Sequence, residues 1–454
     1  MFYFREDELA KIREFSQSDI EKAMAIYGRR RVGKTELVLQ YVHSAENAVY
    51  FQVFGYDYNI ALEDFKRTLS GSLSDEMIMT FSSFKDVFTY LSKVEHNPLV
   101  IIIDEFPFLA RKNENVPFEF QWIIDHGLNK IKLILMGSSL SFMKHQIHDE
   151  QAPLYGRFDE ILKVVPFTFD EICRLYLDYE SAVNVYAMTG GVAQYVNFFL
   201  GYANPEDAAD HLLFSNNGRL IQETGNILMQ ELRDITTYTT ILRALGTGEK
   251  DASAIAKKGR IDTRNIYPYL NKLADLEIIS TVRNPLSQKK NEVRYCISDL
   301  FFRFHYAFIE PNISMITSIG PESKKFILTN GYHEYLGFMY EEIIRNNLYR
   351  YAVSGRIPFM PQITGKWWGN VQQNGKWYET EIDVLALDRQ HLIAGECKYR
   401  EKEVGIGILD DLKLKTAFIP ADDREIYYLL ASKSGFTDEL MQMNDPHLIL
   451  IDRS

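Results

Sequence analysis

The sequence has few of the features that mark secreted, zinc-binding or membrane proteins. It contains only three cysteines, Cys173, Cys296 and Cys397, whose scattered spacing suits neither a disulfide framework nor structural zinc. No apolar run approaches the roughly 20 residues that cross a bilayer. The N-terminal segment is charged within its first residues, which argues against a secretory signal. We therefore expect a protein of the reducing cytoplasm with no membrane partner.

An excess of positive charge is also missing. The formal net charge of −12 argues against a protein that coats nucleic acid through bulk charge, although a local basic patch stays compatible with it. Internal repeats and low-complexity tracts are not evident. A chain of 454 residues is too long for one hydrophobic core, so we expect about two to four domains.

What is present includes a phosphate-binding motif in "AMAIYGRRRVGKTELVLQYV". An apolar strand over 23–27 leads into a loop with the spacing GxxxxGK(S/T), and a helix begins at about Lys34. Backbone N–H groups at a helix N-terminus surround phosphate, and glycines let the backbone approach it closely. Lys34 would reach the β and γ phosphates of ATP, and the Thr35 hydroxyl would bind Mg²⁺. The expected nucleotide-binding residues of the loop are Gly28, Arg31, Val32, Gly33, Lys34, Thr35 and Glu36.

The same loop holds three consecutive arginines, Arg29, Arg30 and Arg31. We interpret their side chains as the solvated outer side of the loop. Contact with phosphate or with a partner domain is the alternative, and no catalytic role is assigned to them.

Two further apolar strands end in residues suited to a nucleotide site. "VIIIDEF" places Asp104 and Glu105 at the carboxyl end of a buried strand, where Asp104 would hold Mg²⁺ and Glu105 would polarise the attacking water. "LILMGSS" ends beside Ser138, which would sense the γ-phosphate or else cap the next helix. Downstream, Arg157 would stabilise transition-state charge, in cis or across a subunit interface, or would pair with a surface acid.

These motifs resemble those of a known ATPase family. "FREDELAKI", "GRRRVGKTEL", "VIIIDEFPFL", "LILMGSSLSFM", "PLYGRF" and "TGGVAQYV" follow one another as in an AAA-type family found mainly in archaea, which is similar to the STAND signalling ATPases. The resemblance covers about the first half of the chain. It implies an αβα nucleotide-binding domain, a helical lid and a capacity to form homo-oligomers. The family usually has Gly-Gly-x-Pro where this chain has Gly190-Gly191-Val192-Ala193. The resemblance therefore does not predict the exact conformation of this turn in the lid.

The middle of the chain changes character. Three short amphipathic segments are followed by two strand-like pieces, which is the element order of a winged helix and resembles the winged-helix part attached to this family. Arg264, Asn265 and Lys272 on the third helix, with Lys289 and Lys290 on the wing, would contact DNA. An interdomain spacer with a solvated polar face is the alternative.

A second candidate site lies in "WYETEIDVLALDRQHLIAGECKYR", which predicts a hairpin. Strand alternation allows Asp383, Glu396 and Lys398 to converge at one end of the hairpin. Two carboxylates and a lysine suit a divalent-metal nuclease: the acids bind Mg²⁺, and the lysine orients or deprotonates water. Glu341, on an upstream amphipathic helix, is a candidate third acid. A ladder of cross-strand ion pairs is the alternative.

The order of these residues resembles the PD-(D/E)xK nuclease superfamily and the nuclease-like domain that accompanies this ATPase family. The resemblance implies that Asp383 is the main metal ligand, Glu396 the second and Lys398 the catalytic lysine. Glu341 would be the helix acid, with Glu342 as its competitor.

The sequence therefore predicts a multidomain α/β protein. We expect a P-loop αβα sandwich over 1–165, a helical lid over 166–230, a winged helix over 231–310 and a restriction-endonuclease-like α/β domain over 311–454. The expected function is ATP binding and hydrolysis, with ATP state controlling a Mg²⁺-dependent nuclease-like domain that acts on DNA. The alternative is a STAND-like nucleotide switch whose C-terminal domain binds nucleic acid or protein without cleaving.

Overall fold

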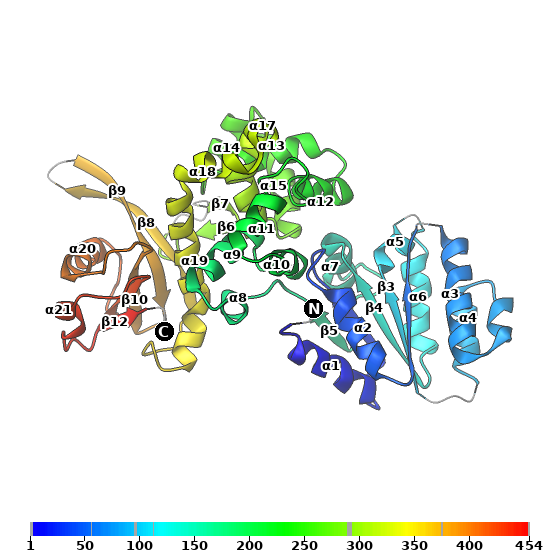
Figure 1. The fold of residues 1–454 in the computed structure, drawn as a ribbon. Coiled ribbons are helices and arrows are strands. Elements are labelled where there is room, and N and C mark those ends of the chain that lie inside the picture. Colours follow the sequence, from blue (N-terminus) through cyan, green and yellow to red (C-terminus); the bar gives the residue numbers. More distant parts are fainter. Residues whose placement is uncertain are drawn as a thin grey trace. The chain divides into compact units, whose positions relative to one another are not determined.

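The computed structural model describes residues 3–55, 57–94, 98–111, 113–287, 293–373 and 376–452. The chain forms two compact units. Unit 1 and unit 2 each combine segments from distant parts of the sequence (Figure 1). Unit 1 comprises Met1–Asp178, Thr189–Ala208 and Gly225–Arg233, and unit 2 comprises Tyr179–Met188, Ala209–Thr224 and Asp234–Ser454. Helices of the expected lid are divided between the units, and the four-domain division stays a prediction.

The centre of unit 1 is a parallel five-stranded sheet in the order β2-β3-β4-β1-β5. Its strands are β1 Ala23–Tyr27, β2 Ala48–Gln52, β3 Leu99–Asp104, β4 Ile131–Gly137 and β5 Glu160–Lys163. The three central strands are buried along their whole length, as expected for a sheet covered on both faces. The predicted strand at 23–27 is confirmed.

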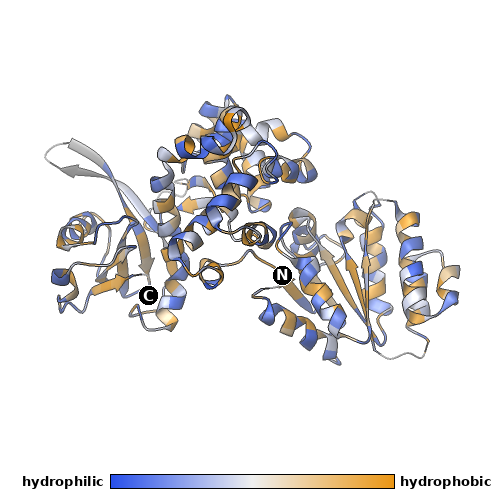
Figure 2. Cartoon of the chain, in the orientation of Figure 1, coloured by the Kyte–Doolittle hydropathy of each residue, from blue (hydrophilic) through white to orange (hydrophobic). Residues whose placement is uncertain are grey.

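Helices cover both faces of this sheet, and alternate strand residues face opposite sides. Phe15 and Val38 pack with Ile102 on one face, whereas Phe65 and Phe120 pack with β3 on the other. Figure 2 shows these strands as largely hydrophobic between helices of mixed character. The covering helices are α1 Glu6–Gln17, α2 Lys34–Ser44, α3 Tyr58–Leu73, α4 Phe84–Leu91, α5 Phe106–Ala110, α6 Val116–His126 and α7 Leu140–His148. Unit 1 is therefore an αβα sandwich, as predicted.

Unit 1 also contains helices from the expected lid. They are α8 Phe169–Leu175, α10 Ala193–Leu200 and most of α12 Glu223–Glu231. The turn before α10 depends on Gly191, which has φ +69°. A side chain would not fit there, because a Cβ would lie 2.1 Å from the Phe167 carbonyl oxygen. The Gly191 carbonyl accepts a hydrogen bond from the Phe167 N–H at 2.8 Å. This close approach holds the turn without the family's proline.

Unit 2 begins its main run with three helices and a two-stranded antiparallel sheet. These are α13 Ile235–Leu245, α14 Ala252–Gly259, α15 Ile266–Asp275, β6 Ile279–Arg283 and β7 Val293–Ile297. They follow one another in the predicted order. The third helix begins at Ile266, after the predicted contact residues Arg264 and Asn265, because the Asp262 side chain accepts from the Arg264 N–H and holds a 3₁₀ turn there. Lys289 and Lys290 lie outside the described residues.

Further helices connect this segment to the C-terminal sheet. They are α16 Leu300–Phe304, a π-helix His305–Ile309, α17 Ile313–Ile319, α18 Ser323–Thr329 and α19 Tyr332–Val353. From earlier in the chain, unit 2 also includes most of α9 Tyr179–Thr189 and the second half of α11 Pro205–Leu212. The hydroxyl of Tyr335 on α19 donates to the Ala187 carbonyl at 2.8 Å, which ties the early segment Tyr179–Met188 into unit 2.

The C-terminal part of unit 2 is a mixed five-stranded sheet in the order β12-β11-β10-β9-β8. Its elements are β8 Ile363–Gln373, β9 Lys376–Leu387, β10 His391–Lys398, α20 Ile406–Thr416, β11 Glu425–Ser432, α21 Asp438–Met441 and β12 Leu448–Ile451. β8, β9 and β10 are antiparallel, whereas β10, β11 and β12 are parallel. Leu409 and Leu412 of α20 pack with Leu385 of β9 in one core. The predicted hairpin is confirmed.

Candidate functional site

The lysine of the phosphate-binding loop is hydrogen-bonded to backbone carbonyls of the same loop. Gly33, with φ +96°, is the N-cap of α2 and turns the chain so that Lys34 opens the helix. Lys34 Nζ donates to the Gly28 carbonyl at 2.9 Å and to the Arg29 carbonyl at 3.0 Å. Burial lowers the pKa of Lys34 to about 8, against the opposing charges of Glu105 and Asp104. The ammonium therefore lies where the loop would surround phosphate.

The base of the loop is packed tightly against the end of β5. A Cβ on Gly28 would lie 2.2 Å from the Val164 carbonyl oxygen, so only glycine fits there. The buried Arg5 guanidinium donates to the Val32 carbonyl at 3.2 Å and to the Val165 carbonyl at 2.6 Å. The loop is thus fixed from outside by the N-terminal segment and by the chain that follows β5.

The side chains of the three loop arginines are less exposed to solvent than predicted from the sequence. All three are half-buried. The Arg30 guanidinium lies 5.9 Å from the ring centroid of Phe108, and that of Arg31 lies 5.8 Å from Tyr195 on α10. The Arg31 carbonyl accepts from the Gln194 N–H at 3.0 Å. Arg31 therefore connects the loop to a lid helix, because both its backbone and its side chain contact α10.

Asp104 and Thr35 lie in direct contact at the predicted magnesium site. Thr35 Oγ1 donates to Asp104 Oδ2 at 2.8 Å, and the Tyr50 hydroxyl donates to the same oxygen at 2.8 Å. Burial, followed by the Asp104 charge, raises the pKa of the Tyr50 phenol far above its usual value. A hydroxyl beside a buried carboxylate suits Mg²⁺, so these residues fit the ion. Tyr50 was missed because a tyrosine inside β2 carries no motif.

Glu105 lies beside the residue predicted to sense phosphate. Ser138 Oγ donates to Glu105 Oε2 at 2.9 Å. Glu105 has φ +56°, an uncommon value for a residue with a side chain, and it precedes α5 as its N-cap. This backbone conformation directs the carboxylate from the end of β3 to the end of β4. The candidate base Glu105 and the candidate sensor Ser138 are therefore hydrogen-bonded to each other.

The next serine joins a second pair of charged residues. Arg111 donates to Ser139 Oγ at 2.9 Å, and Ser139 Oγ donates to Glu231 Oε2 at 3.0 Å. Arg111 also contacts the Glu231 carboxylate at 3.3 Å. Glu231 ends α12, far from β4 in sequence, so no local pattern identified it.

Two predicted residues lie away from these contacts. Arg157 Nε donates to both carboxylate oxygens of Asp125, at 3.1 and 3.2 Å, which is the predicted alternative of pairing with a surface acid. Glu36 is exposed in the first turn of α2, where Gln40 donates to it at 3.4 Å. The Glu36 side chain therefore faces solvent, and any contact with phosphate would come from its backbone.

In unit 2 the predicted hairpin residues come together. Gly395 lies opposite Val384, and continuing this register places Glu396 opposite Asp383. Asp383 Oδ2 accepts from the Cys397 N–H at 2.8 Å, and Lys398 Nζ donates to Glu396 Oε1 at 2.6 Å. Both carboxylates are buried.

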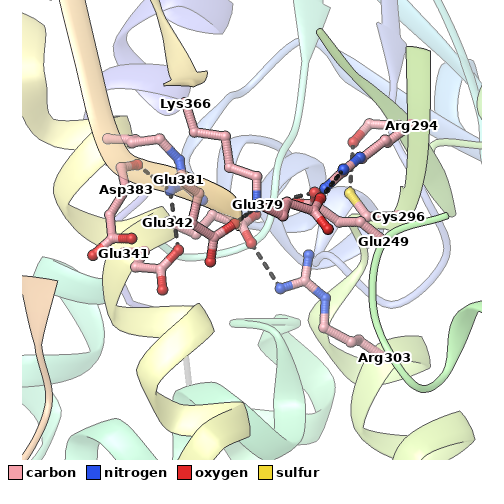
Figure 3. A network of polar contacts seen from close by, with 12 residues as sticks. Glu249, Arg294, Cys296, Arg303, Glu341, Glu342, Lys366, Glu379, Glu381 and Asp383 are labelled. Atoms are coloured by element: carbon pink, nitrogen blue, oxygen red, sulfur yellow. Dashed lines mark hydrogen bonds and ion pairs between the residues drawn. The ribbon is translucent and has the colours of Figure 1, made fainter. Parts of the chain in front are cut away.

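Of the two candidate helix acids, Glu341 is the one that lies beside this pair. Arg345 donates to the Asp383 carbonyl at 2.6 Å and to Glu341 Oε2 at 3.4 Å, which joins α19 to β9. Figure 3 shows Glu341 and Asp383 in the same polar network. Burial is the largest cause that raises the pKa of Glu341 to about 8, and the negative charge of Asp383 is the second. Burial and then the negative charge of Glu396 raise the pKa of Asp383 to about 6. Glu342 instead pairs with Arg303 at 2.8 Å.

The acids of unit 2 fit a divalent cation only in part. Glu341 and Asp383 are crowded carboxylates whose mutual repulsion a cation would relieve. Within the described ranges, however, no three His, Cys, Asp or Glu side chains form a ready metal-binding group. Both oxygens of Glu396 are held by lysines, Oε1 by Lys398 and Oε2 by Lys415 at 2.9 Å. Lys415, near the end of α20, was not identified from the sequence.

The described residues predicted to contact DNA are mostly exposed, whereas the β6–β7 hairpin that follows them is packed against other parts of unit 2. Arg264 is exposed and pairs with Asp262 at 2.8 Å. Asn265 is exposed and Lys272 is half-buried. The hairpin, in contrast, contacts the C-terminal sheet: Asn284 donates to the Trp368 carbonyl at 2.8 Å. Arg294, on β7, lies 4.6 Å from the Trp368 ring centroid.

Comparison with known proteins identifies the chain's relatives. Residues 2–198 match a family described as an ATPase domain predominantly from Archaea, and residues 305–408 match a family of archaeal and bacterial proteins of unknown function. The uncharacterized protein MJECL04 of Methanocaldococcus jannaschii is 30% identical over 448 residues, which cover 95% of this chain and 96% of that protein. The chain belongs to the same family. Its N-terminal part is an archaeal-type P-loop ATPase domain.

Similarity to one solved structure supports the fold, and a second match is weaker. The Walker-type ATPase PABY2304 of Pyrococcus abyssi is 20% identical, with a TM-score of 0.50, and the match covers 67% of this chain and 96% of that one. The ORC2 protein of Aeropyrum pernix, in its ADPNP–ADP complexes, is 12% identical with a TM-score of 0.44, over 72% of this chain and 96% of that one. In the described part of this ATPase, no helix combines the length and apolarity needed to cross a membrane.

Proposed function

We propose that this protein hydrolyses ATP in unit 1 and that its nucleotide state controls a Mg²⁺-dependent nuclease-like site in unit 2, which acts on DNA. The proposal depends chiefly on one observation. Helix α19 and strands β9 and β10 bring Glu341, Asp383, Glu396 and Lys398 together from distant parts of the sequence.

In the ATPase domain each residue has a chemical role. Bound MgATP supplies the phosphoanhydride that is broken. Lys34 would exchange its two carbonyl partners for phosphate oxygens. Thr35 and Asp104 would hold the magnesium ion. Glu105 would orient the attacking water once Ser138 turns from its carboxylate toward the γ-phosphate.

In unit 2 the residues suit metal-assisted hydrolysis of a phosphodiester. The cation, when bound, supplies Lewis acidity at the scissile phosphate. Glu341 and Asp383 would bind it through carboxylate oxygens, while Arg345 holds their two elements together. Lys398 would position the water that attacks phosphorus. Contact with DNA is proposed for α13 to β7 acting as a winged helix, through the exposed Arg264 and Asn265.

End-labelled DNA incubated with Mg²⁺ or Mn²⁺, with and without ATP, tests the proposal. We expect metal-dependent cleavage that Asp383→Ala abolishes and that Lys34→Ala makes insensitive to ATP. Cleavage that survives Asp383→Ala, or that ATP never alters, would contradict it.

A second candidate is a nucleotide switch whose C-terminal domain binds without cleaving. The observation that favours it is the double pairing of Glu396 with Lys398 and Lys415, which occupies both oxygens of one predicted metal ligand. ATP hydrolysis lost in Lys34→Ala, together with DNA binding but no cleavage under any divalent metal, would select this alternative.

A further inference from the structure

The nuclease-like site contains a lysine that no motif supplies. Lys415 lies in the last turn of α20, and its Nζ donates to Glu396 Oε2 at 2.9 Å. Lys398 holds the other oxygen at 2.6 Å. Glu396 is buried, whereas each lysine side chain is 29% exposed. Both lysine side chains are therefore more exposed than the carboxylate that they contact.

Acidic and basic side chains gather around this carboxylate. Glu341, Asp383 and Glu396 are accompanied by the cationic groups of Arg345, Lys398 and Lys415, and the charges of Lys366 and Glu381 also act on Glu341. A divalent cation that binds the acids would add positive charge to this group, which suits an anionic phosphodiester. It would also compete with an ammonium for Glu396, since a carboxylate oxygen directed at a metal no longer accepts from lysine.

We propose that Lys415 is a phosphodiester-binding residue of this site: it neutralises Glu396 in the metal-free protein and binds a non-bridging phosphate oxygen of DNA when the cation takes Glu396 Oε2. A lysine ammonium has three donors on a flexible stem, so it can move between the two acceptors. This inference depends on the proposed metal site.

The helix offers a matched control. Lys413 lies two residues earlier on α20 but approaches Asp445, at 3.9 Å, and the Tyr428 ring, at 5.3 Å from its centroid. Lys413→Gln and Lys415→Gln remove the same charge from the same helix. A difference between them therefore reports on the contact with Glu396.

Full-length protein is measured with two ligands, Mn²⁺ alone by titration calorimetry and a DNA duplex in Ca²⁺ by anisotropy. In Lys415→Gln we expect Mn²⁺ to bind about fivefold more tightly, because its competitor is gone. DNA should bind about tenfold more weakly, because a charge-assisted contact with phosphate is lost. Lys415→Arg should restore DNA binding, and Lys413→Gln should resemble the wild type.

A merely structural lysine would give another result. Weaker binding of both Mn²⁺ and DNA in Lys415→Gln, or values equal to those of Lys413→Gln, would overturn the assignment of Lys415 alone. Failure of the wild-type protein to bind Mn²⁺, or binding that Asp383→Asn leaves unchanged, would overturn the metal site and this inference together.

Discussion

Ser139 and Glu231 are 92 residues apart in the sequence, yet the serine hydroxyl donates to the glutamate carboxylate at 3.0 Å. Ser139 follows Ser138, which contacts Glu105, so the residues after β4 contact the candidate base Glu105 through one serine and α12 through the next. Unit 2 resumes at Asp234, three residues after Glu231. The chain segment that contacts the end of β4 is therefore only three residues from the start of the segment that contains α13.

Glu231→Gln should weaken the attachment of α12. The substitution removes the charge that Arg111 and Ser139 contact, and the Glu231 side chain is only 6% exposed, so we expect a loss of about 1–2 kcal/mol in unfolding free energy. Hydrogen exchange should rise in α12 and no longer respond to ATP. Met229→Ala, at an exposed position of the same helix, is the control. Unchanged exchange in α12 would refute this connection.

Lys34→Ala should strongly weaken nucleotide binding with little effect on stability. The lysine is buried, and its pKa of about 8 reflects desolvation that the folded protein must offset. Its loss should weaken ATP binding by about 100-fold, measured with a fluorescent ATP analogue, because a charge-assisted contact with phosphate disappears. The melting temperature without nucleotide should stay close to that of the exposed-lysine control Lys11→Ala. ATP binding that persists in Lys34→Ala would contradict the assignment of the loop.

Asp383→Asn should make the metal-free protein more stable while removing cleavage. Burial and the neighbouring Glu396 raise the pKa of Asp383 to about 6, so its charge destabilises the fold at neutral pH. We expect unfolding free energy to increase by about 1–2 kcal/mol at pH 7.5 in the presence of EDTA. Glu381→Gln, at a half-exposed position of the same strand, should change stability far less. A lower melting temperature for Asp383→Asn would contradict the proposed repulsion.

His305 should make the protein sensitive to acid. Burial lowers the pKa of this imidazole to about 4, and its Nδ1 has no hydrogen-bond partner. The neutral ring is favoured in the folded state, so its stabilising contribution is complete above the ordinary pKa of about 6.5 and is lost as the pH falls toward 4. Denaturant unfolding should lose up to about 3 kcal/mol over this interval. His305→Phe should flatten that loss, whereas His43→Phe, at an exposed position, should not.

The sequence was informative wherever chemistry and geometry are local. The loop from Gly28 to Thr35 is a contiguous motif, and strand alternation was enough to bring Asp383 and Glu396 together because the two strands are adjacent in a hairpin. The helix acid was ambiguous between Glu341 and Glu342. Only the packing of α19, with Arg303 occupying Glu342, separates them.

Contacts between distant elements were beyond prediction. Lys415 reaches Glu396 from a helix whose position depends on the packing of the sheet, and Tyr50 reaches Asp104 from a neighbouring strand. Neither has periodicity or spacing to single it out. The arginines of the loop were misjudged for the same reason, because the rings that cover Arg30 and Arg31 belong to α5 and α10.

The tight fit of Gly28 against Val164 has an evolutionary consequence. A side chain at this position is excluded by the protein's own backbone, independently of any phosphate. A descendant that had abandoned nucleotide would therefore be free to replace Lys34 and Thr35, while the glycine would still be retained by purifying selection. Among distant homologues, an orphaned glycine at this place would mark a former ATPase.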